Sequence, residues 1–142
     1  MELLLDVNTF GITETSLIRL RNELARRIDN HVEIHKIDTN VCCCGFLLLD
    51  FTKDEAVWTG DGFRTDGGGE GGVGYNTAMA LLEIFGDSPY DMDLGLGAFQ
   101  TGEEAEVKEK LELHLKEYLV EGNPPPEKLA DRKPRYLRGG RI

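Results

Sequence analysis

The chain has 142 residues, of which 40% are hydrophobic and 30% are charged, which is enough for one packed domain. Its longest apolar runs, residues 46–49 and 78–82, are far shorter than the roughly 20 residues that cross a membrane. The first residues lack the basic start and the long apolar stretch of an export signal. We therefore expect a cytoplasmic protein with no membrane partner.

The net charge of −10 comes from 26 acidic residues against 16 lysines and arginines, and it is unevenly distributed. Residues 50–122 carry 17 acidic and 5 basic residues, whereas residues 123–142 carry 2 acidic and 6 basic ones. Because phosphate binding needs a basic surface, this balance argues against a nucleic-acid partner. An acidic surface favours binding to a basic protein partner, or it only keeps the protein solvated.

The first 58 residues predict one helix among four strands. The strands are expected at residues 2–7, 32–35, 41–51 and 56–58. Between the first two strands, Thr13 or Thr15 can cap a helix that ends before Asp29. On its outer face, Glu23 and Arg27 are four residues apart and form a supporting ion pair. The continuous apolar run within residues 41–51 predicts a central strand that is covered on both faces.

The second half of the chain predicts two helices between loops. A glycine-rich loop at residues 59–74 precedes a helix at residues 78–85, which stops at Gly86. Residues 87–100 are expected as a second loop, and Thr101 caps the last helix. The helix ends at Gly122, before three consecutive prolines.

The order of elements, β-α-β-β-β-α-α, is typical of an α+β domain. Short connections favour a small, mostly antiparallel sheet, with about three helices packed on one face. We assign residues 1–122 to this domain, and residues 123–142 to a proline-rich linker and a basic C-terminal tail.

The glycine-rich loop is the strongest functional signal, because eight of its sixteen residues are glycine. Glycine lets backbone N–H groups approach a ligand closely, and the N-terminus of the following helix favours an anion. The loop lacks the lysine and hydroxyl residue of a P-loop, and a flexible surface loop is the simpler interpretation. We predict that it binds a nucleotide or a nucleotide-derived anion, as a binding or regulatory module without a cofactor. The expected ligand-binding residues are Trp58, Asp61, Phe63, Arg64, Thr65, Asp66, Glu70, Tyr75, Asn76 and Thr77. Arg64 would bind the anion, and Trp58 or Phe63 would stack on a base.

Metal binding is a second interpretation of the same loop. Asp61, Asp66 and Glu70 offer oxygen ligands for a divalent cation, and a metal-dependent hydrolase would use them. Zinc binding by histidines and cysteines is disfavoured, because His31 and His35 stand about 13 Å apart on a strand. The three consecutive cysteines, Cys42, Cys43 and Cys44, are expected as reduced, buried or half-buried thiols.

A third interpretation is an acidic protein-interaction inhibitor or a nucleic-acid mimic, which needs no pocket and binds a basic partner. The basic tail can also pair with the acidic body of a neighbouring subunit, so we expect a homo-oligomer.

Overall fold

The structure is a computed structural model that describes residues 1–39, 42–92, 94, 99 and 102–120. Along the chain its elements are β1 (Glu2–Leu4), the short 3-10 helix η1 (Val7–Thr9), α1 (Thr13–Arg26), β2 (Val32–Asp38), β3 (Cys43–Asp50), β4 (Glu55–Trp58), β5 (Phe63–Arg64), α2 (Gly69–Phe85), β6 (Tyr90–Met92) and α3 (Glu104–Val120). The predicted α+β class is confirmed. None of the helices in the described part of the chain could cross a membrane, since none is both long and apolar enough.

The sheet is mixed, whereas the sequence predicted a mostly antiparallel one. Its six strands follow the order β1-β4-β3-β2-β6, and β5 pairs with β3 outside this path. The hairpins β2–β3 and β3–β4 are antiparallel, as their short connections require. The two outer pairs, β1–β4 and β2–β6, are parallel because each joins strands that lie far apart in the sequence. Strand β6 lies in the predicted loop at residues 87–100.

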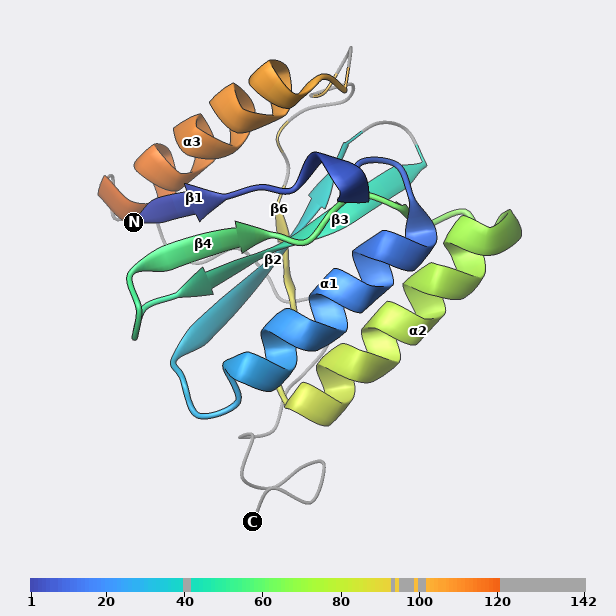
Figure 1. The fold of residues 1–142 in the computed structure, drawn as a ribbon, viewed down its shortest axis with the longest axis horizontal. Coiled ribbons are helices and arrows are strands. Elements are labelled where there is room, and N and C mark those ends of the chain that lie inside the picture. The colour runs from blue at the N-terminus through green and yellow to red at the C-terminus, as the bar shows by residue number, and fades with distance from the viewer. Residues whose placement is uncertain (40–41, 93, 95–98, 100–101, 121–142) are drawn as a thin grey trace.

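Helices cover both faces of the sheet, not one face as predicted (Figure 1). α1 and α2 lie side by side on one face, and α3 lies on the other. Alternate residues of β3 belong to the two cores: Phe46 and Leu48 pack with the α1–α2 layer, while Leu47 and Leu49 pack with α3. The prediction that β3 is a central strand covered on both faces is therefore confirmed.

The start of α1 differs from the predicted threonine cap. The residue before the helix is Ile12, in an extended conformation and with no side-chain cap. The hydroxyl of Thr13 donates instead to the backbone carbonyl of Gly62 at 2.5 Å, which ties the helix to the segment after β4. The predicted cap of the last helix, Thr101, lies outside the described residues.

Candidate functional site

The second half of the glycine-rich loop is helical. α2 begins at Gly69, nine residues before the predicted start at residue 78, and four of its first six residues are glycine. Glycine is a poor helix former and costs about 1 kcal/mol per residue relative to alanine. Tertiary packing must therefore compensate for this cost.

Close contacts explain two of these glycines, Gly72 and Gly74. A Cβ atom at Gly72 would lie 2.5 Å from the carbonyl carbon of Gly67, and one at Gly74 would overlap the Thr13 methyl group. One at Gly62 would overlap the backbone of Ile12. The glycines thus bring α2 against α1 and against the turn after β5, which is a structural role that needs no ligand.

Asp66 lies immediately before the N-terminus of α2 and pairs with the groups beside it. Asp66 accepts a hydrogen bond from the backbone N–H of Gly68 at 2.9 Å, and it forms an ion pair with Arg64 at 2.5 Å. The hydrogen bonds from Arg64 and from the Gly68 backbone N–H hold the pKa of Asp66 well below its usual range. Asp66 therefore competes with an anionic ligand for Arg64 and for the Gly68 N–H.

The structure does not bring the predicted ligand-binding residues into one site. Trp58 and Phe63 are fully buried in different cores, Trp58 toward α3 and Phe63 toward α1 and α2, so neither can stack on a base. Tyr75 is partly buried and stacks on Phe46, with ring centroids 6.4 Å apart. Asp61 accepts a hydrogen bond from the Gly11 backbone N–H at 2.6 Å.

The remaining predicted residues lie around α2 and the turn before it. Thr65 is exposed, and its backbone N–H donates to the carbonyl of Cys42. Glu70 is exposed in the first turn of α2, and Asn76 and Thr77 are exposed further along the helix. Binding of a nucleotide here remains a prediction.

The described residues contain no group of three or more potential metal ligands. Asp61, Asp66 and Glu70 therefore do not form a cluster in the part of the chain that the structure describes. The three cysteines are reduced thiols, and burial raises the pKa of Cys44 to about 12.

A buried pair of histidines lies between the sheet and α3. His35 Nδ1 and His114 Nε2 are 2.9 Å apart, and the hydroxyl of Tyr118 donates to Glu33 at 2.7 Å. The sequence predicted helices on one face of the sheet only, and therefore none on this face. α3 covers this face, so both imidazoles are buried.

We expect acid to weaken folding through this pair. Burial lowers the pKa of both histidines, and that of His114 falls to about 4, helped by its proximity to His35. Between the unfolded value near 6.5 and the lower folded value, the unfolded chain binds more protons. Stability should therefore fall by about 1–2 kcal/mol from pH 7 to pH 5 in urea titrations. In His114→Gln, which cannot titrate, this loss should be smaller, and an unchanged loss would contradict the assignment.

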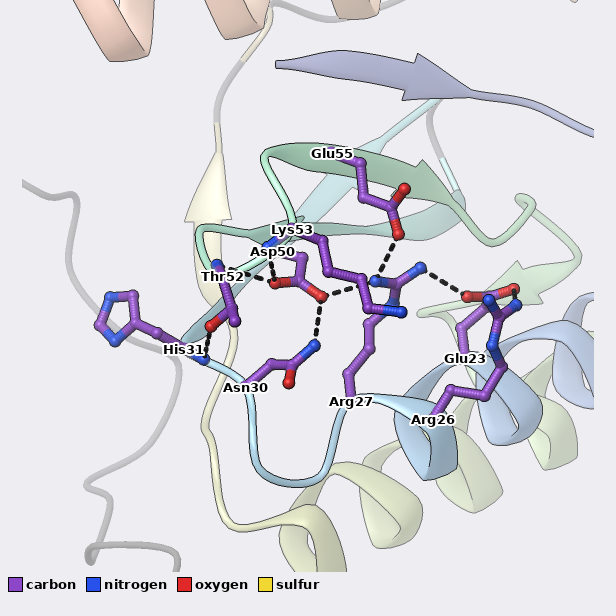
Figure 2. A network of polar contacts seen from close by, with 9 residues as sticks. All are labelled: Glu23, Arg26, Arg27, Asn30, His31, Asp50, Thr52, Lys53 and Glu55. Atoms are coloured by element: carbon purple, nitrogen blue, oxygen red, sulfur yellow. Dashed lines mark hydrogen bonds and ion pairs between the residues drawn. The ribbon is translucent and has the colours of Figure 1, made fainter.

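Arg27 is the centre of a buried network that the sequence predicted as an exposed pair (Figure 2). Its guanidinium contacts Glu23 at 2.8 Å, Asp50 at 2.6 Å and Glu55 at 2.7 Å. Only 1% of the Arg27 side chain is exposed. Asp50 also accepts hydrogen bonds from the Asn30 amide and from the backbone N–H groups of the turn after β3. The network joins the end of α1 to β3 and β4, so we assign it a structural role.

The outer side of α1 and α2 is the candidate functional surface. On α2, Val73, Thr77, Ala80 and Ile84 are exposed and follow one another at intervals of four, three and four residues. This is the spacing of residues on one side of a helix, and that side exposes two large apolar side chains, Val73 and Ile84. Val73 is 68% exposed and Ile84 is 60% exposed, although the opposite side of α2 already packs on the sheet.

An apolar groove continues this stripe toward α1. Its volume is about 200 Å³, and it is lined by Arg21, Leu24, Ala25, Ile28, Leu81, Ile84 and Phe85. Ile18, 43% exposed, lies one turn before Arg21 on the outer side of α1. We call the exposed residues Ile18, Arg21, Ala25, Val73, Thr77, Ala80 and Ile84, together with the groove, the α1–α2 surface.

Sequence reasoning missed this surface because it placed residues 59–74 in a loop and began the helix at residue 78. The sequence does contain a signal for this surface, because no lysine or arginine occurs between residues 69 and 85. A surface helix normally carries charged residues on its solvent side.

Comparisons of the chain with protein families, curated proteins and solved structures find no match.

Proposed function

We propose that this protein is a protein-interaction module and that the α1–α2 surface is its docking site. The observation that carries this proposal is the exposed apolar stripe of α2, which continues into a groove formed with α1. Contiguous apolar surface of this kind favours contact with another protein, because water is released from it on binding.

Two features favour this function over recognition of an anion at the start of α2. Asp66 neutralises Arg64 and accepts from the Gly68 N–H, so a phosphate would have to displace a carboxylate. The aromatic rings of Trp58 and Phe63 are buried and cannot contribute stacking. The α1–α2 surface has neither obstacle, since its apolar side chains already face solvent.

Photo-crosslinking tests the docking site. A benzophenone amino acid placed at Ile84 should capture a protein, either in the purified sample or in an extract of the producing cells. The same label at Leu113, which is 50% exposed on α3, is the matched control and should capture nothing. Adducts from position 84 should disappear when Ile18→Glu is added in the same chain, with the fold checked by circular dichroism. If both labels give the same products, or if neither gives any, the docking proposal is wrong.

A further inference from the structure

We infer that the occupant of the α1–α2 surface is a second copy of this chain, an inference that rests on the proposed docking function. The argument comes from the charges that border the surface. α1 contributes the exposed Arg21, which lines the groove, whereas the charged residues of α2 are Glu70 and Glu83. The surface thus has a basic side and an acidic side.

α1 and α2 run in the same direction. This limits the symmetric arrangements in which the surfaces of two copies can contact each other. Near their starts, Gly74 of α2 lies against Thr13 of α1. Near their ends, Ile28 and Phe85 line the same groove. A two-fold axis parallel to the helices and midway between them would place α1 of each copy opposite α2 of the other. Because this rotation leaves each residue at the same height along the helices, Arg21 of one copy would then face the part of α2 around Glu83 in the other, twice in each dimer.

Other classes of partner match these charges less well. A strongly basic protein would be repelled by Arg21, and a strongly acidic one by Glu70 and Glu83.

Sedimentation equilibrium of the whole purified chain tests this inference. The wild-type protein should have the mass of a dimer at micromolar concentrations. Ile84→Glu should raise the dimer dissociation constant at least about 50-fold, because the carboxylate would be buried without a partner at two equivalent positions. Leu113→Glu is the matched control on α3 and should leave the constant within about twofold. Urea titrations check that both variants fold.

A charge exchange tests the orientation of the two copies. Arg21→Glu alone and Glu83→Arg alone should each weaken the dimer about tenfold, because each places like charges in the interface. The double variant should recover most of the wild-type affinity. A dimer that responds equally to Ile84→Glu and Leu113→Glu, or a double variant no better than either single one, would overturn the inference.

A monomeric wild-type chain would also overturn it, and photo-crosslinking then decides whether the docking function itself survives. Adducts from position 84 with a different protein in the extract would support a docking site whose occupant is not a second copy. Loss of those adducts as well would remove both proposals. The two failures are therefore distinguishable.

Discussion

Arg27→Met should lower the free energy of unfolding by about 3–5 kcal/mol, the usual cost of removing one partner from a buried ion pair. Methionine keeps much of the volume of the side chain but leaves Asp50 and Glu55 without Arg27, and Glu23 with only the exposed Arg26. Burial opposes the charge of Arg27, yet the hydrogen bonds to Glu55, Asp50 and Glu23 raise its pKa. The guanidinium is therefore stabilised by these three carboxylates, and they depend on it in turn.

Urea titrations at pH 7 measure this effect, and Arg26→Met is the matched control. Arg26 is the next residue and pairs with Glu23 at 3.1 Å, but its side chain is 60% exposed. Exposed ion pairs contribute little, so the control should lose less than about 1 kcal/mol. Similar losses for the two variants would show that the buried network does not determine stability.

Gly72→Ala and Gly74→Ala should each lower the free energy of unfolding by about 1–3 kcal/mol, although alanine is the better helix former. At Gly72 the new methyl group would meet the backbone of Gly67, which cannot move aside cheaply. At Gly74 it would overlap the Thr13 methyl group and push α2 away from α1. The overlap should outweigh the gain in helix propensity at both positions.

The glycine variants separate the packing role from a role in ligand binding. Asn76→Ala is the control on the same helix, because Asn76 is exposed and alanine there adds propensity without a clash. It should be neutral or slightly stabilising in thermal unfolding of the ligand-free protein. If the glycines served only a ligand, Gly72→Ala and Gly74→Ala would behave like Asn76→Ala.

The candidate site could be predicted from the sequence only in part. The glycine-rich segment was recognised as unusual, but glycine serves close backbone packing as well as ligand approach. The spacing of the glycines along the chain does not distinguish these two roles. The structure does, because it shows that Gly72 contacts Gly67 and that Gly74 contacts Thr13. The exposed stripe of α2 became visible only when residues 69–77 proved to be helical.

The sequence by itself determined the α+β class and the type of most elements. Hydrophobic periodicity is a local property, so it identified α1, the end of α2, and the central strand β3 with its two covered faces. Tertiary structure alone decided which faces the helices cover, the parallel pairs β1–β4 and β2–β6, and the burial of Arg27 and His35. Each of these depends on contacts between segments far apart in the chain. Local periodicity carries no information about such contacts, because it depends only on how neighbouring residues project from the backbone.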